Sequence, residues 1–129
     1  MPSTRIATGD WARGREPEIL EAVHSALVKG IKIPDWDRDV VVDIYSDDSR
    51  MSPPNRTPRY TRIEIALYLG RSLDAKRALY KELVKNLEVL GVEPSDLKII
   101  LIEFPLDNCA PHGAEPACDI QDLGYAVTV

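Results

Sequence analysis

Apolar and polar positions follow a β-like alternation, then a helical spacing, then a second β-like run, and this order occurs twice in the chain. In each half, a Gly-Arg pair separates the first β-like run from the helical segment. The four β-like runs are residues 2–8, 40–45, 60–69 and 97–104. The pattern predicts a single domain over 1–129, with β-α-β half-repeats over about 2–46 and 59–104 and a tail over 105–129.

Both predicted helices have one apolar face and typical end residues. The residues sharing a face are Ile19, Leu20, Val23, Leu27 and Val28 in the first helix, and Leu79, Leu83, Val84, Leu87 and Leu90 in the second. Glu16-Pro17 and Ser72 suit helix N-termini, whereas Gly30 and Gly91 occur where C-terminal caps are expected. Each helix is therefore predicted to cover a sheet.

The two halves also share residues. The segment Thr4-Arg5-Ile6 recurs as Thr61-Arg62-Ile63, and six residues between 14 and 29 are identical to those 56 positions later. These matches indicate an internal duplication, and the alternative is that two amphipathic helices share Leu, Ala and Lys.

Residues 46–59, SDDSRMSPPNRTPR, predict a linker that crosses between the halves or lies over a site. The β-like run at 124–129 predicts a strand that closes the sheet or joins a neighbouring subunit.

Composition narrows the class of protein. With 129 residues and 44% hydrophobic content, the chain is long enough for one core without metal or disulfide support. A formal net charge of −5 argues against a dedicated surface for nucleic acid or anionic membrane. No apolar stretch is long enough to span a bilayer or act as a signal peptide, so we expect a cytoplasmic protein.

Several motifs in order resemble the tautomerase superfamily, above all its long, fused-chain branch that includes malonate semialdehyde decarboxylase. They are Pro2 after the initiator, the TRI-type strand, Gly70-Arg71-Ser72 at the turn into the second helix, and GVEPSD before the last long strand. The resemblance implies an α+β fold in which a duplicated β-α-β unit forms a four-stranded sheet with two helices on one face. It also implies a homotrimer that acts on a small carboxylate without metal or organic cofactor.

Pro2 is the residue on which an enzymatic interpretation depends. Once Met1 is removed, its secondary amine is a base or nucleophile, and burial or a nearby cation would lower the pKa of that amine toward neutrality. The alternative is that Pro2 only begins a strand, where its missing N–H costs no hydrogen bond. If Met1 is retained, the Pro2 nitrogen is an amide and is not a catalyst.

Three further residues complete the expected site. Arg71, at a strand-to-helix turn, suits a bidentate pair with a substrate carboxylate, and its alternative is an exposed pair with Asp74. Arg15 is its counterpart in the first half, where Glu16 would partly neutralise it and a solvated surface role is favoured. Asp37 matches an aspartate that the decarboxylase resemblance implies, although Asp35 and Asp39 stand close by and a turn role is the usual one.

The resemblance leaves the activity open. Tautomerisation of a 2-keto acid is the first hypothesis, decarboxylation or hydration of a three-carbon acid the second, and a non-catalytic trimeric scaffold or ligand-binding protein the third. Leu69 stands where the decarboxylase resemblance implies a second arginine, which weakens the second hypothesis. A ferredoxin-like regulatory module is the alternative fold for the same order of elements. Cys109, His112 and Cys118 fit no common zinc spacing, and we predict no metal site.

Overall fold

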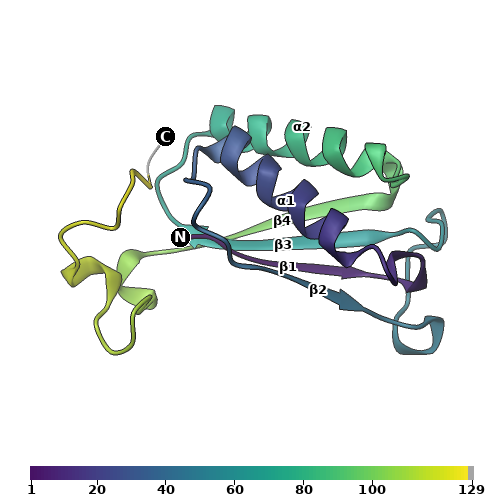
Figure 1. Cartoon of the computed structure of the whole chain (residues 1–129), viewed down its shortest axis with the longest axis horizontal. Coiled ribbons are helices and arrows are strands. Elements are labelled where there is room, and N and C mark those ends of the chain that lie inside the picture. The colour runs from purple at the N-terminus through teal and green to yellow at the C-terminus, as the bar shows by residue number, and fades with distance from the viewer. Residues whose placement is uncertain (128–129) are drawn as a thin grey trace.

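The computed structural model describes residues 1–127, in which two long helices cover one face of a four-stranded sheet (Figure 1). The elements are β1 (Ser3–Thr8), α1 (Glu16–Ile31), β2 (Val40–Ile44), β3 (Thr61–Tyr68), α2 (Leu73–Val89) and β4 (Leu97–Phe104). Strands form at the four β-like runs between residues 2 and 104, each within one residue of its expected ends. The predicted α+β fold is therefore confirmed.

The strand order is β2-β1-β3-β4, with β1 parallel to β2, β3 parallel to β4, and the two inner strands antiparallel. Each half of the chain thus forms a β-α-β unit whose two strands are direct neighbours. In a ferredoxin-like split unit, another strand lies between the two parallel strands. Because no strand intervenes here, the ferredoxin-like alternative is wrong.

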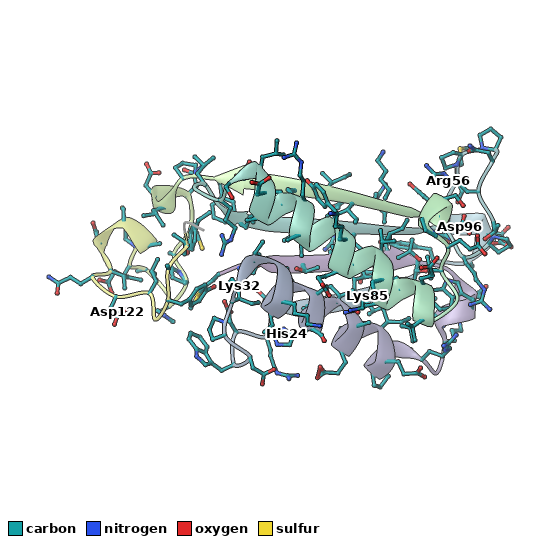
Figure 2. All side chains as sticks on the ribbon, turned by 90° about the horizontal axis from the view of Figure 1, so that it is seen from above. His24, Lys32, Arg56, Lys85, Asp96 and Asp122 are labelled. Carbon is teal, nitrogen blue, oxygen red and sulfur yellow. The ribbon has the colours of Figure 1, made fainter. Side chains whose placement is uncertain are left out.

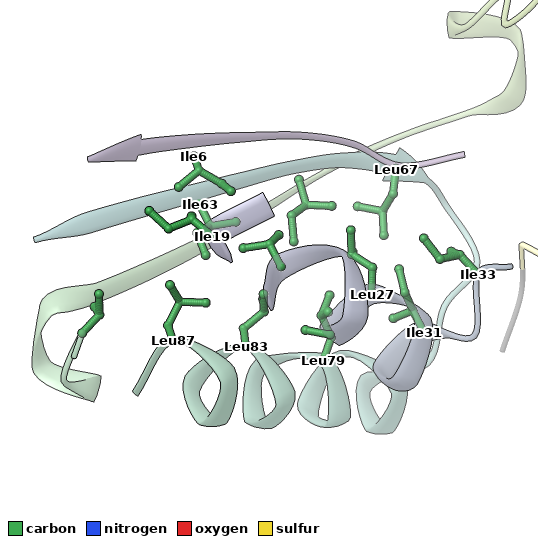
Figure 3. Close-up of a cluster of buried hydrophobic side chains, with 14 of the residues drawn as sticks. Ile6, Ile19, Leu27, Ile31, Ile33, Ile63, Leu67, Leu79, Leu83 and Leu87 are labelled. Atoms are coloured by element: carbon green, nitrogen blue, oxygen red, sulfur yellow. The ribbon is translucent and has the colours of Figure 1, made fainter. Parts of the chain in front are cut away.

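The core lies between the sheet and the two helices (Figure 3). Strand and helix residues that meet there are 1% exposed or less, among them Ile6, Ile63, Leu67, Ile19, Val23, Leu27, Leu79, Leu83 and Leu87. The helical members all belong to the predicted apolar faces. Burial of each such side chain stabilises the fold by roughly 1.5–3 kcal/mol. Because this gain is largest when the apolar face of a helix packs on the sheet, the helical spacing predicted the packing face correctly.

The ends of α2 follow their sequence signals. The Ser72 hydroxyl accepts a hydrogen bond from the Ala75 amide at 3.1 Å and so caps the N-terminus. At the other end Gly91 has a φ of +94°, and its amide donates to Glu88 at 3.0 Å. Glycine adopts this left-handed conformation without a Cβ penalty, so the predicted cap at Gly91 is confirmed.

Gly30, by contrast, is not a helix cap. Helix α1 continues to Ile31, and it is Lys32 that has the left-handed φ of 62°. A Cβ atom at Gly30 would lie 2.6 Å from the Leu79 Cα atom. Glycine is therefore needed here because α1 and α2 cross closely, and the sequence could not distinguish this use from a cap.

The linker and the tail lie at opposite ends of the sheet. Arg56 of the linker and Asp96 lie at one end, and Asp122 of the tail at the other (Figure 2). Thr57 fixes the linker by donating its amide to the buried Asp96 carboxylate at 2.8 Å. The linker therefore does not cover the end of the sheet where the chain begins.

The tail is irregular apart from short 3-10 turns at Leu106–Asn108 and Ala117–Asp119. The strand predicted at 124–129 does not form over residues 124–127, which make bends, and positions 128 and 129 lie outside the described residues. Within residues 1–127, neither helix combines the length and apolarity needed to cross a membrane.

The close helix crossing yields a stability prediction. Gly30→Ala should lower the free energy of unfolding by about 1–3 kcal/mol, because the added methyl group overlaps the Leu79 backbone. The matched control is Ser25→Ala on the exposed side of α1, where we expect a change within about 0.5 kcal/mol. Urea unfolding measures both, and a Gly30→Ala protein as stable as the control would refute the crossing.

Candidate active site

The antiparallel pairing of β1 and β3 brings the start of the chain beside the end of β3. Ser3 pairs with Ala66, and the same register continued sets Pro2 opposite Leu67 and Met1 opposite Tyr68, so the turn after β3 lies close to the chain start. The loop before β2 and the segment after β4 reach the same end, because each is parallel to its neighbour. Pro2 is buried there, and Asp37 and Arg71 are only 8% and 5% exposed. Three of the four predicted site residues thus gather at one end of the sheet.

Arg71 is positioned by the turn that joins β3 to α2. Gly70, with a φ of 127°, reverses the chain in a conformation that other residues rarely adopt. Ser72 then caps the helix. The backbone is thus fixed on both sides of Arg71, and the Arg71 side chain lies inside the protein instead of in solvent.

The Arg71 guanidinium is buried and lacks a partner. None of its three nitrogen atoms has a hydrogen-bond partner among residues 1–127. The alternative partner Asp74 binds Arg77 at 2.9 Å, and the nearby Glu103 binds Lys76 at 2.7 Å. Burial lowers the pKa of the guanidinium, whereas nearby Tyr125, Asp37 and Glu103 raise it. A buried cation with unused donors is suited to bind an anion, and a carboxylate matches the planar geometry of arginine.

Asp37 is the aspartate of its loop that faces the site. Its carboxylate accepts a hydrogen bond from the Tyr125 hydroxyl. The other two acids of the loop are engaged elsewhere, Asp35 with Arg38 at 3.0 Å and Asp39 with Ser3 at 2.6 Å. Of the three neighbouring acids, Asp37 is the one whose charge raises the pKa of the amine at the chain start.

Tyr125 was missed by the sequence analysis. Its ring contacts the exposed Trp36 edge-on, with centroids 5.9 Å apart, and this contact helps to dock the tail on the loop that holds Asp37. Burial and the neighbouring Asp37 raise the pKa of Tyr125, so its hydroxyl stays protonated and donates at neutral pH. No motif marks a single tyrosine in an irregular tail, and the β-like pattern around it pointed to a strand.

The amino group at the chain start is less basic than usual. The pKa of the Met1 amine is lowered from 8.0 to about 6, mainly because burial removes water from the ammonium form. The carboxylate of Asp37 raises this pKa, the guanidinium of Arg71 lowers it, and Cys109 raises it slightly. An amine placed at this end of the sheet is thus mostly unprotonated near pH 7, as a base must be.

Arg15 does not join the other predicted site residues. It lies at the far end of the sheet, where its Nη1 atom donates to the Leu90 carbonyl at 3.2 Å. Its guanidinium also lies 3.6 Å from the Glu18 carboxylate and 5.6 Å from the centroid of the Trp11 ring. Within this chain Arg15 therefore supports the end of α2 and does not contact Pro2.

The cysteines and histidine of the tail do not form a cluster. Cys109 is half-buried and close enough to the chain start to influence the Met1 amine, whereas His112 and Cys118 are exposed. In the described part of the chain, no three His, Cys, Asp or Glu side chains come together as metal ligands.

Known proteins share this fold. A family model described as "Tautomerase enzyme" matches residues 37–109. Similar solved structures include FG41 malonate semialdehyde decarboxylase inhibited by 3-bromopropiolate (24% identity, TM-score 0.78, 88% of this chain and 91% of that chain). A second is Pt0534 inactivated by 2-oxo-3-pentynoate (20% identity, TM-score 0.79, 90% of this chain and 97% of that chain). A third is a fused 4-OT symmetric trimer (18% identity, TM-score 0.76, 89% of this chain and 95% of that chain). At these identities the similarity concerns the fold.

The charges around the chain start predict opposite effects of two substitutions. In protein whose intact mass includes Met1, Asp37→Asn should lower the pKa of the amino-terminal amine, because a favourable negative charge is lost. Arg71→Gln should raise it, because a repelling positive charge is lost. Arg15→Gln, at the far end, should not change it. NMR titration of the amine tests all three, and shifts of the same sign for Asp37→Asn and Arg71→Gln would contradict the arrangement.

Proposed function

The chain belongs to the tautomerase enzyme family, and from this membership we propose that it catalyses keto-enol tautomerisation of a small 2-keto acid or related carboxylate. In this proposal Pro2 becomes the first residue after Met1 is removed, and its amine moves the proton. The observation that supports it most is the buried Arg71 guanidinium, which has unused donors beside the start of the chain.

The proposed chemistry requires an unprotonated amine. With a pKa of about 6, about nine-tenths of the amine at this position is unprotonated at pH 7. Pro2 lies one residue further into the protein and is itself buried, and we infer that burial lowers the pKa of its free amine as well. It would take the proton from the carbon next to the keto group and return it to the keto oxygen to give the enol, while Arg71 holds the carboxylate and offsets the charge of the intervening enolate.

Decarboxylation or hydration of a three-carbon acid is the second candidate, and Asp37 supports it. A buried carboxylate beside the amine is placed to orient a water molecule or the proline, and Tyr125 fixes its orientation. The missing arginine weighs against it, since Leu69 is 53% exposed and offers no charge to a second carboxylate oxygen. We therefore rank tautomerisation first. Separately, we propose a cytoplasmic location, as the sequence leads us to expect.

We also propose a homotrimer, the assembly named for a fused 4-OT of similar fold. Part of the sheet face away from the helices is uncovered in the single chain, and this part mixes apolar residues with paired charges. Val41 and Ile102 are each 48% exposed there. The ion pair between Arg5 and Asp43, 3.1 Å apart, crosses the same face. Burial of the apolar part against two further copies would remove this exposed surface from water.

The catalytic proposal is tested with protein of verified mass that begins at Pro2, using enolised phenylpyruvate as the probe. Pro2→Ala should lower kcat/KM by about 10²- to 10⁴-fold, because the secondary amine is the base. Arg71→Gln should lower it by about 10- to 100-fold through loss of charged hydrogen bonds to the carboxylate. Spectrophotometric ketonisation rates supply the measurement.

Arg15→Gln is the matched control, since this arginine follows the equivalent Gly-Arg turn at the far end of the sheet. Its kcat/KM should stay within about twofold of wild type. If Pro2→Ala retains activity within a few-fold, or if the native protein keeps Met1, the proline mechanism is wrong. A trimer without any Pro2-dependent turnover would instead favour the non-catalytic scaffold.

The proposed homotrimer is tested by two substitutions, each of which introduces a charge at an exposed apolar residue. Ile102→Lys should convert the trimer to smaller species, because a buried unpaired ammonium opposes association. Val89→Lys, on the outside of α2 where the residue is 82% exposed, should leave the trimer intact. Light scattering after size exclusion gives the masses, and a trimer that survives Ile102→Lys would place the interface elsewhere.

A further inference from the structure

Tyr68, the last residue of β3, is buried although its side chain lies on the sheet face away from the helices. It shares that face with its register partner Phe104, whose ring it meets edge-on at 5.2 Å and 70°. In the segment after β4, the Cys109 thiol lies beside the Tyr68 hydroxyl. The side chain of Tyr68 is 0% exposed.

The hydroxyl of Tyr68 has no hydrogen-bond partner among residues 1–127. The neighbouring thiol of Cys109 is a weak acceptor and makes no hydrogen bond of normal geometry with it. Leaving a hydroxyl buried and unpaired is costly, and a phenylalanine would fill the same volume without that cost. The hydroxyl therefore calls for an explanation other than packing.

The position of Tyr68 links it to the candidate site. The charge of Asp37 acts on Tyr68, and Tyr68 in turn acts on Tyr125, so the three groups are close neighbours. Tyr125 already donates to Asp37. Among residues 1–127, the buried side-chain donors without a partner include the nitrogen atoms of Arg71, the hydroxyl of Tyr68 and the hydroxyl of Thr4 in β1.

We propose that Tyr68 is a substrate-binding and catalytic residue, whose hydroxyl donates a hydrogen bond to the 2-keto oxygen of the acid that Arg71 holds by its carboxylate. This assignment rests on the substrate class of the proposed function. In this arrangement Arg71 binds the carboxylate and Tyr68 binds the keto oxygen, so one small molecule supplies acceptors to both groups. The assignment also supplies a donor close to Leu69, where the decarboxylase resemblance implied an arginine.

A neutral donor suits this oxygen. Burial raises the pKa of Tyr68, and the nearby Cys109 and Asp37 raise it further, so the hydroxyl keeps its proton throughout the neutral range. As the proton leaves the neighbouring carbon, negative charge develops on the keto oxygen and strengthens the bond that Tyr68 donates. The donor thus contributes more to the transition state than to substrate binding.

Two ligands separate recognition of the keto oxygen from recognition of the carboxylate. Oxamate carries a carbonyl next to its carboxylate and is not attacked by an amine, whereas propionate has the carboxylate alone. Calorimetric titration of protein that begins at Pro2 should show oxamate binding about tenfold more tightly than propionate, the value of one hydrogen bond. Tyr68→Phe should reduce this preference to about one and leave propionate binding unchanged. Arg71→Gln should weaken both ligands.

Tyr60→Phe is the matched control, because Tyr60 is a buried tyrosine just before β3, at the opposite end of the sheet. It should keep the preference for oxamate. Thermal unfolding gives a second readout: Tyr68→Phe should be at least as stable as wild type, since no hydrogen bond is lost. A Tyr68→Phe protein that keeps the preference for oxamate, or a wild-type protein that shows none, overturns the proposal.

Turnover distinguishes this inference from the proposed function. With phenylpyruvate, Tyr68→Phe should lower kcat by about 10²-fold and raise KM by about tenfold, because the hydrogen bond is made to the bound substrate and strengthens in the transition state. If Pro2→Ala has no effect on turnover while the oxamate preference depends on Tyr68, the tautomerase proposal fails and the keto-acid site stands. If Pro2 is essential but the preference is independent of Tyr68, the enzyme stands and Tyr68 is excluded.

Discussion

The antiparallel pairing of β1 with β3 is the constraint on which the rest of the structure depends. It is the pairing that joins the two β-α-β units into one sheet, and its register sets Ser3 opposite Ala66. The chain start is thereby fixed beside the turn at Gly70-Arg71. A slip of one residue would exchange the two faces of β1, so the buried face of the strand holds this register in place.

The charges at that end are arranged so that the arginine stays free. A carboxylate near Arg71 would normally neutralise it, but Glu103 is bound by Lys76 and Asp37 accepts from Tyr125. Arg71 is thus left buried with a positive charge and unused donors. The same burial that makes this arrangement costly also lowers the pKa of the neighbouring amine, so one feature of the fold supports both parts of the proposed reaction, binding of the carboxylate and transfer of the proton.

Local patterns determined most of the fold, whereas contacts distant in sequence determined what could not be predicted. The alternation in β1 to β4, the helical apolar faces and the caps at Ser72 and Gly91 are local signals, and they hold in the structure, whereas the alternation after residue 123 does not form a strand over residues 124–127. Gly30 was misassigned because its role depends on a helix that follows it by more than forty residues. Tyr125 was missed for the same reason, since only the folded tail brings it to Asp37.

The two Gly-Arg turns show how one sequence signal leads to different chemistry. Both glycines have a positive φ, and both arginines precede or begin a helix. At the far end, the Leu90 carbonyl and the Trp11 ring occupy Arg15, so its charge stabilises the C-terminus of α2. At the near end, no such partner among residues 1–127 reaches Arg71. The arginine of the first half-repeat is therefore a structural cap, whereas that of the second keeps the unused donors on which the proposed binding role rests. The surroundings of the motif make the difference.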